Sequence, residues 1–529
     1  MLAQMALQAG QGPKGYFYQT WKSTMTPIPF SDYPKEPVVL NNLSEKMMRE
    51  SRFVPLEIGK DYLRVAMADP GDFYTVESLE MAYGLKIDVT FGKESDILDT
   101  IERLHGAGSQ SLENIIEEAD KDIYDLSSEG VEDADHLRDL ASEAPIIRLV
   151  NRLILNAVEQ KASDIHFEPF ENVFKVRYRI DGVLHDVDSP PKRLQAAIIS
   201  RVKIMAKLDI AERRLPQDGR IKLKIADKEI DFRVSTIPTL YGESLVMRIL
   251  DRGSLILDLE KIGFPGGLLE KYMRLVKQPY GMILVTGPTG SGKTSTLYTT
   301  LAKINAPENK IITLEEPVEY QLDGVNQIQV NQKIGMTFAK GLRSIVRQDP
   351  DIILVGEIRD RETAEIAIQS ALTGHLLFST LHTNDAAGAV TRLLDMGVEN
   401  FLLSSTLLGV LAQRLVRVIC SNCKEEIMPD GKLIKSMNLP PEEEKTITFY
   451  EGKGCEECRY TGFKGRTAIF EYLAVDDDIR REISKNSPTE TIKDVALRKG
   501  MITLRDDGWR KVRKGMTTIS EVLKVTLEK

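Results

Sequence analysis

The sequence predicts an α/β protein of several domains, the largest of which is a parallel sheet that carries a phosphate-binding loop. Three observations lead to this prediction. Residues 287–294 read GPTGSGKT, between a short apolar run and a helical pattern. Short apolar segments alternate with helical ones from 263 to 419, which is typical of a parallel sheet covered on both faces. Two Cys-x2-Cys pairs predict a metal-binding insertion in the same domain.

Length and composition limit the class of protein. With 529 residues the chain is too long for one core, and roughly three or four domains are expected. A net charge of −9 argues against a nucleic-acid partner, which needs a basic surface. The most apolar stretch, 401–412, is too short to span a membrane, so we expect a buried helix there. The N-terminus shows no secretory signal, and a total of four Cys fits a reducing cytoplasm.

The N-terminal part begins with an arm and a small module. Residues 1–40 mix Gly, Pro and polar residues without periodicity, and we expect a loosely ordered arm. Residues 41–105 are predicted to be a small α/β docking module. In it a helix starts near Leu43, an alternating strand covers Tyr62–Met67, and a second helix covers Thr75–Tyr83.

Two linkers separate the folded parts. Residues 106–142 are predicted to be an acidic, flexible linker, because 113–140 contain eleven Asp or Glu and two Lys or Arg. A solvated spacer is the expected role of such a segment. A second, short linker is expected at 251–262.

Residues 143–250 are predicted to form a mixed α/β domain with an antiparallel sheet. Pro145 lies in the first turn of an amphipathic helix. Lys175–Ile180 alternates strictly, and the pair Asp181-Gly182 is a hairpin turn into the next strand. A second alternating pair of segments follows within 220–237.

Residues 263–529 form the predicted nucleotide domain. Its expected strands are 282–286, 310–314, 351–356 and 376–381, and its tail, 475–529, is predicted to be helical. In the phosphate loop, the glycines let backbone N–H groups turn toward phosphate oxygens, and the following helix adds partial positive charge. Nucleotide contacts are expected from Gly287, Pro288, Thr289, Gly290, Ser291, Gly292, Lys293, Thr294 and Ser295.

The catalytic magnesium site is predicted from the loop and from one strand end. Lys293 can reach the β- and γ-phosphates, and the Thr294 hydroxyl can hold Mg²⁺. Glu357 follows the apolar run 352–355, and ligands of open parallel sheets bind at such strand ends. We therefore expect Glu357 to hold Mg²⁺, directly or through water, together with Thr294; a cap or an ion pair is the alternative role for this carboxylate.

Further acids and two histidines are candidates for the hydrolytic step. Glu315 and Glu316 end another strand, and either could orient the attacking water; ordinary surface carboxylates are the alternative. Pro317 stops a central strand, so both acids are expected on the exposed rim. His375 and His382 flank the strand 376–381, and each is a candidate for contacting the γ-phosphate or sensing its loss.

The cysteines predict a structural metal. Cys420 with Cys423, and Cys455 with Cys458, form two chelating pairs that together complete a four-thiolate site for Zn²⁺. Such a set leaves no open ligand position, so the ion should stabilise a lobe over 420–458 rather than catalyse. Chance pairs of buried thiols and a redox role are the alternatives.

The order of these motifs resembles that of the secretion ATPase superfamily. The resemblance rests on the phosphate loop, TLEEPVE at 313–319, LVGEIRD at 354–360, and the Gly374-His375 pair followed by LHTND at 381–385. The four-Cys insertion is similar to that of the secretion and pilus-assembly branches and differs from the retraction branch. The segments ASDIHFEP and RYRIDGVLH look like the N2 domain of that superfamily, and the segments LASEAP and IMAKLDIAERRLPQDGR look most like those of its type II secretion ATPases, the GspE family.

The resemblance covers about 41–529 and implies a fold and an activity. It implies a RecA-like P-loop ATPase domain, preceded by a mixed α/β, PAS-like N2 domain and a small α/β N-terminal module. It also implies ATP and Mg²⁺ as ligands, a homohexamer, and docking of the N-terminal region to an inner-membrane platform protein. The chain would then be cytoplasmic and peripheral to the bacterial inner membrane.

The resemblance also assigns residues, with one departure. The family commonly has Glu-Asp-Pro where this chain has Glu315-Glu316-Pro317, which favours Glu315 as the water-orienting acid. The family places arginines at the phosphates, and the candidates here are Arg220, Arg233, Arg343 and Arg347.

Three rival functions stay open at this point. A type IV pilus assembly ATPase would share almost every motif. A RecA-like nucleic-acid translocase would share the fold, although the acidic balance argues against it. A non-catalytic, nucleotide-gated scaffold would lack a use for the paired acids.

Overall fold

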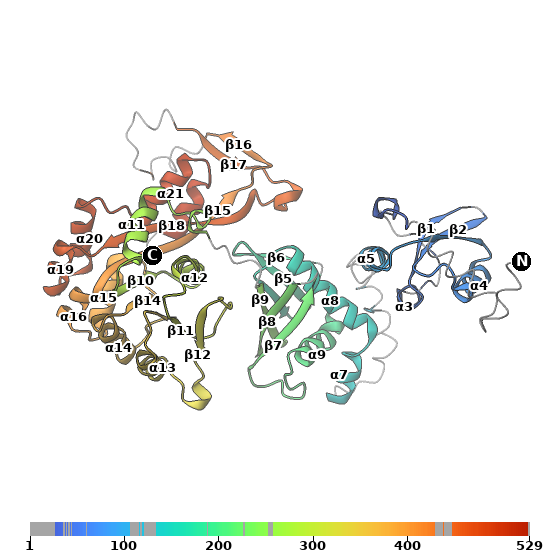
Figure 1. Cartoon of the computed structure of the whole chain (residues 1–529), viewed down its shortest axis with the longest axis horizontal. Helices are drawn as coiled ribbons and strands as arrows, with labels where there is room; N and C mark the ends of the chain where they lie inside the picture. Colours follow the sequence, from blue (N-terminus) through green and yellow to red (C-terminus); the bar gives the residue numbers. More distant parts are fainter. Residues whose placement is uncertain are drawn as a thin grey trace, which may run out of the picture. The chain divides into compact units, whose positions relative to one another are not determined.

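The computed structural model of the chain (Figure 1) describes residues 27–526 apart from 35–37, 39, 41–42, 44, 60, 106–115, 117–118, 121–133, 188, 226–227, 252–257, 429–436 and 438–446. Most of the predicted arm (1–40) and of the predicted acidic linker (106–142), and half of the second predicted linker (251–262), lie outside these residues.

The first folded part is a three-stranded sheet with three helices. β1 pairs antiparallel with β2, and β2 pairs parallel with β3. Its core is formed by Met48, Phe53, Leu63, Leu79 and Ile97, all fully buried. The elements are β1 (Phe53–Ile58), β2 (Tyr62–Met67), β3 (Lys86–Phe91), α3 (Glu45–Glu50), α4 (Phe73–Tyr83) and α5 (Glu94–His105).

The second part, in its described residues, is a six-stranded sheet with three α-helices, and its strand order is β6-β5-β4-β9-β8-β7. Asp181 and Gly182 both have positive φ (49° and 85°), as the predicted hairpin turn requires. The elements are α7 (Ala134–Leu140), α8 (Ala144–Glu159), β4 (Asp164–Pro169), β5 (Phe174–Ile180), β6 (Val183–Asp186), α9 (Gln195–Met205), β7 (Gln217–Ile225), β8 (Lys228–Thr239) and β9 (Gly242–Asp251).

The third part, 258–526, is a seven-stranded sheet in the order β12-β11-β13-β14-β10-β15-β18. The strands from β12 to β15 are parallel, and β18 pairs antiparallel with β15 at the edge. The strands are β10 (Gly281–Thr286), β11 (Ile311–Glu315), β12 (Val325–Gln329), β13 (Ile352–Val355), β14 (Leu376–Leu381), β15 (Leu407–Ile419) and β18 (Phe463–Ala474).

Helices cover both faces of this sheet, and this explains why its central strands are apolar throughout. Along β10, Met282 and Leu284 belong to one core, and Ile283 and Val285 belong to the other. The helices are α10 (Leu259–Ile262), α11 (Gly266–Val276), α12 (Lys293–Ile304), α13 (Phe338–Ile345), α14 (Arg361–Leu372), α15 (Ala386–Asp395), α16 (Asn400–Thr406), α19 (Asp477–Ser484), α20 (Thr489–Arg498), α21 (Leu504–Arg513) and α22 (Ile519–Thr526).

The structure corrects the helix predicted over 401–412. α16 ends at Thr406, and Leu407 already has extended dihedrals (φ −71°, ψ 119°). From there the chain forms β15, the longest strand of the sheet, beside β10. A short apolar run does not distinguish helix from strand, and here the β-branched residues that follow, such as Val410 and Val416, favour the strand.

A small lobe interrupts the connection between β15 and β18. It contains the hairpin of β16 (Lys424–Ile427) and β17 (Phe449–Gly452), which pair antiparallel. Cys420 N donates to Gly462 O (2.9 Å), so the two ends of the lobe are joined where it leaves the sheet. Among the described residues, no helix combines the length and apolar character needed to cross a membrane.

Candidate functional site

The phosphate loop lies between β10 and α12, where the sequence predicts it. Gly287, Gly290 and Gly292 have φ of 151°, 78° and 88°, a region that side chains rarely adopt. α12 begins at Lys293, and all nine predicted nucleotide contacts, 287–295, lie on this loop and the first turn of α12. Lys293 Nζ donates to the carbonyls of Gly287 (2.7 Å) and Pro288 (3.1 Å). Burial lowers the pKa of Lys293 to about 8.

Glu357 lies on the same side of the sheet as Lys293, where the carboxyl ends of the strands lie, and it comes just after the end of β13. Its carboxylate contacts Arg359 Nη2 (2.5 Å) and His382 Nε2 (3.5 Å). The carboxyl ends of β10, β13 and β14 meet at this edge because the three strands are parallel neighbours. Burial, followed by the charge of Lys293, lowers the pKa of His382. The structure therefore brings together Lys293, Glu357 and His382, which the sequence singled out, and Arg359, which it did not.

The structure corrects the exposure expected for Glu315. Its side chain is not on the rim, because the residue is only 4% exposed at the end of β11. Tyr298 donates to Glu315 Oε2, and Thr313 (2.5 Å) and Gln327 (3.3 Å) donate to Oε1. Burial raises the pKa of Glu315, although these three hydrogen bonds act in the opposite direction.

Glu316 does lie on the exposed rim, where Gln332 and Arg359 are its neighbours. Gln332 Nε2 donates to Glu316 Oε1 (2.9 Å), and Arg359 Nη1 lies 3.8 Å from Glu316 Oε2. Arg359 therefore lies between Glu316 and Glu357, and its guanidinium links the two strand-end acids.

The other candidate residues of the nucleotide domain, His375, Arg343 and Arg347, make contacts outside this cluster. His375 precedes β14 and lies at the end of that strand opposite to His382, where its Nδ1 contacts Ser370 O (2.8 Å). On α13 and the turn after it, Arg343 pairs with Glu362 (2.7 Å), and Arg347 donates to Arg343 O (2.7 Å). Arg220 lies on β7 and Arg233 on β8, in the second folded part.

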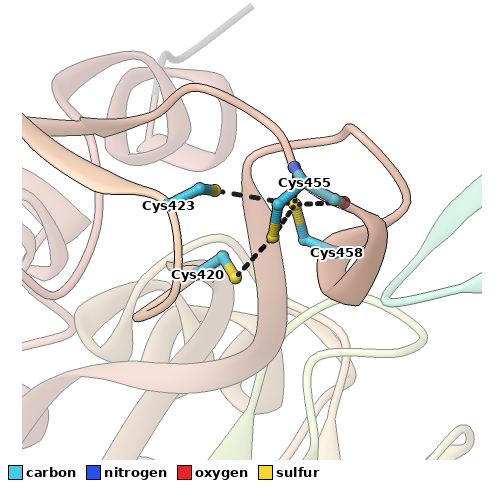
Figure 2. A group of neighbouring side chains, drawn as sticks. All are labelled: Cys420, Cys423, Cys455 and Cys458. Atoms are coloured by element: carbon cyan, nitrogen blue, oxygen red, sulfur yellow. Dashed lines mark hydrogen bonds between the residues drawn. The ribbon is translucent and has the colours of Figure 1, made fainter.

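The four cysteines form one cluster in the lobe (Figure 2). Their sulfur atoms all lie within 4.8 Å of one another. The Cys420–Cys455 distance is 3.9 Å, and the Cys423–Cys458 and Cys455–Cys458 distances are 3.7 Å. A tetrahedral ion with metal–sulfur bonds of about 2.3 Å requires edges of about 3.8 Å. The cluster therefore has the dimensions of a four-thiolate metal site.

Backbone and side-chain donors surround these sulfur atoms. Gly454 N donates to Cys423 Sγ (3.3 Å), and Gly462 N donates to Cys458 Sγ (3.3 Å). Asn422 Nδ2 donates to Cys455 Sγ (3.3 Å). Hydrogen bonds of this kind stabilise the thiolate, which is the form that binds metal.

Two family models match the chain. The model described as "Type II/IV secretion system protein" matches residues 139–524, and the model described as "MshEN domain" matches residues 25–111. The first covers most of the chain, including the phosphate loop and the cysteine lobe.

Curated relatives match over most of their own length. Type II secretion system protein E of Xanthomonas campestris pv. campestris is 50% identical over 92% of this chain and 85% of the relative. Type II secretion system ATPase E of Vibrio cholerae is 48% identical over 82% and 86%. The type IV pilus assembly ATPase PilB of Myxococcus xanthus is 45% identical over 94% and 88%.

Solved structures agree on the fold. The pilus retraction motor PilT with bound ADP has a TM-score of 0.50 at 26% identity, over 71% of this chain and 96% of that chain. The ATPase DotB of Legionella pneumophila has a TM-score of 0.52 at 19% identity, over 71% and 94%. These comparisons confirm the predicted RecA-like fold and the resemblance to secretion ATPases. The chain belongs to the type II/IV secretion system protein family and groups with its type II secretion E proteins.

Proposed function

We propose that the chain is the ATPase motor of a type II secretion system, and that it hydrolyses MgATP to power protein export. The observation that carries the proposal is the cluster at one edge of the sheet, where the phosphate loop with Lys293 meets Glu357 and His382. The type II secretion E relatives, about 50% identical over most of the chain, support the cellular role.

Each residue of the cluster has a separate proposed role. The N–H groups of 287–295 and the Lys293 ammonium bind and neutralise the phosphates. The Thr294 hydroxyl and the Glu357 carboxylate are oxygen donors of the kind that Mg²⁺ prefers, and they would hold this ion, which supplies further positive charge when bound. Arg359 and His382 fix the orientation of the Glu357 carboxylate through their contacts with it.

The attacking water needs an acid that orients it and accepts its proton. We propose Glu315 for this role, because its burial raises the pKa of the carboxyl and makes the carboxylate a stronger base. Glu316 is the rival, since it shares Arg359 with Glu357 at the rim. The two acids can be distinguished by substitution.

The remaining parts have proposed structural roles. We propose that the cysteine cluster holds one Zn²⁺ ion per chain and that this ion stabilises the lobe. The chain would assemble as a homohexamer. Its N-terminal module would dock to the cytoplasmic domain of an inner-membrane platform protein, which would hold the motor in the cytoplasm at the membrane surface.

The test is complementation in the source bacterium with its own copy of the gene deleted. Wild-type protein should restore release of exoproteins into the medium, and Lys293→Ala at the same cellular level should not. Surface pili are counted in the same cells, because the relative PilB makes pilus assembly the second candidate. Restored pili without restored secretion would replace the type II assignment with pilus assembly.

A further inference from the structure

Gln413 on β15 is fully buried beside the phosphate loop, and its side-chain amide makes hydrogen bonds in two directions. Its Nε2 donates to Ser291 O in the loop (2.9 Å). Its Oε1 accepts from the Thr296 hydroxyl in the first turns of α12 (2.7 Å). The Gln413 side chain therefore links the Ser291 carbonyl of the phosphate loop to Thr296 on the helix that follows the loop.

The backbone of a phosphate loop has inward-pointing carbonyls that need a hydrogen-bond donor from the protein interior. When its backbone N–H groups turn toward phosphate, the carbonyls of the same peptides turn toward the protein interior. The turns of α12 begin with Thr296 N donating to Gly292 O (3.1 Å), and the carbonyl of the preceding residue, Ser291, takes its donor from Gln413. A buried carbonyl that loses its donor is costly, so this bond favours the loop conformation in which the N–H groups point outward to a ligand.

Steric contacts support the same role. A Cβ atom added to Gly292 would lie 2.7 Å from Gln413 Nε2, and one added to Gly287 would lie 2.5 Å from Gln413 O. Both contacts are too close for real Cβ atoms. The loop thus packs directly on Gln413 at two of its glycines, and it can approach that closely because those glycines lack side chains.

We propose that Gln413 is a positioning residue for nucleotide binding, which holds the peptide after Ser291 in its phosphate-facing orientation. The inference rests on the proposed function, since it assigns a residue to the same nucleotide site. Gln413 does not touch phosphate itself. It acts through the Ser291 carbonyl and the Thr296 hydroxyl.

The test compares nucleotide affinity among matched variants of the full chain. Gln413→Met keeps the length of the side chain and removes both hydrogen bonds, and Thr296→Val removes one. Thr299→Val is the control, because this buried hydroxyl on α12 bonds Ser295 O (2.7 Å) in its own helix. The dissociation constant of a fluorescent MgADP analogue is measured directly, and that of pyrophosphate is measured by displacing the analogue.

We expect Gln413→Met to weaken both ligands about tenfold, because a buried carbonyl without a donor disfavours the binding conformation by an amount of that order. Thr296→Val should weaken them less, and Thr299→Val should bind as wild type. Pyrophosphate tests whether the phosphate loop is the part affected, since a defect in this loop should weaken the binding of pyrophosphate and MgADP equally. Unchanged affinity for both ligands in a folded Gln413→Met protein would overturn the inference.

Two further variants cover a Gln413→Met protein that does not fold and a general loss of nucleotide binding. If Gln413→Met does not fold, Gln413→Asn replaces it, because one methylene less prevents the amide from reaching both partners; wild-type affinity in Gln413→Asn would then overturn the inference. Lys293→Ala is measured in parallel. Loss of binding in Lys293→Ala with wild-type affinity in the Gln413 variants refutes the positioning role alone, whereas a wild-type chain that binds no MgADP refutes the proposed function as well.

Discussion

The buried hydrogen bond between Tyr298 and Glu315 gives a quantitative prediction for the nucleotide domain. Tyr298 is fully buried on α12, and its hydroxyl donates to a carboxylate on β11 that is only 4% exposed. Tyr298→Phe removes this donor and leaves the ring in place. A hydrogen bond to a charged group contributes about 1.5–3 kcal/mol, so the free energy of unfolding at about pH 8 should fall by that amount.

The effect should depend on pH in a definite direction. Burial raises the pKa of Glu315 above its unfolded value, so the folded chain holds this proton more tightly than the unfolded chain. The free energy of unfolding therefore falls as pH rises from the unfolded pKa through the raised folded pKa. Tyr298 favours the carboxylate form, so Tyr298→Phe raises the folded pKa further. Its cost is largest above that pKa and shrinks as the pH is lowered and Glu315 becomes protonated.

The assay is urea unfolding followed by tryptophan fluorescence in a Trp21→Phe background, where the buried Trp509 reports on the nucleotide domain. Tyr272→Phe is the matched control, because Tyr272 is equally buried and its hydroxyl bonds the neutral Thr300 hydroxyl (2.9 Å). The control should cost about 1 kcal/mol at every pH. A loss of unfolding free energy in Tyr298→Phe that equals the loss in the control and does not change between about pH 8 and pH 5 would show that Tyr298 does not stabilise the Glu315 carboxylate.

Three other predictions follow from the site. Glu315→Gln and Glu316→Gln should differ in phosphate release: the variant that binds ATP but does not cleave it has lost the water-orienting acid, and full turnover in both would exclude both. Cys458→Ser should lose the bound metal and with it the fold of the lobe, because metal binding supplies much of the folding free energy of such a unit; about one zinc per chain retained in this variant, by elemental analysis, would contradict a four-thiolate site. A chain that starts at Ala141 should keep nucleotide affinity and metal content but lose membrane association and secretion, and co-sedimentation of the shortened chain with membranes would place the anchor in the motor domains.

The sequence predicts the inner strands of the nucleotide domain well because both faces of those strands are buried. β10, β11, β13 and β14 appear as short apolar runs between turns, and the structure has strands at all four places. The first residues of β15, up to 412, are wrongly predicted as helix, since they continue the apolar character of α16 without a break. The edge strand β18 was not predicted, because its course is fixed by pairing with β15 rather than by a local pattern.

In the candidate site, too, the sequence predicts what depends on neighbouring residues and misses what depends on contacts between distant segments. The phosphate loop, Glu357 and the cysteine pairs lie in short sequence motifs, and the spacing within these motifs is enough to predict phosphate or metal binding. The burial of Glu315 depends on Tyr298 and Gln327, which are distant in sequence, so Pro317 alone gave the wrong exposure. Arg359 carried a signal in its position two residues after Glu357.

Gln413 carried no local signal for a role at the phosphate loop. It lies 122 residues from Ser291 in the sequence, and the pairing of β15 with β10 brings the two residues together. The spacing of a sequence motif therefore does not predict which residues on other strands support that motif, even where the motif itself is clear.

We expect this chain to hydrolyse ATP at the phosphate loop. The decisive measurement is phosphate release from MgATP by the purified chain and by Lys293→Ala prepared in the same way. Lys293 is the ammonium that can neutralise the β- and γ-phosphates in this loop, so we expect turnover in the wild type that requires Mg²⁺ and is abolished in Lys293→Ala. Equal phosphate release by the two proteins would contradict it.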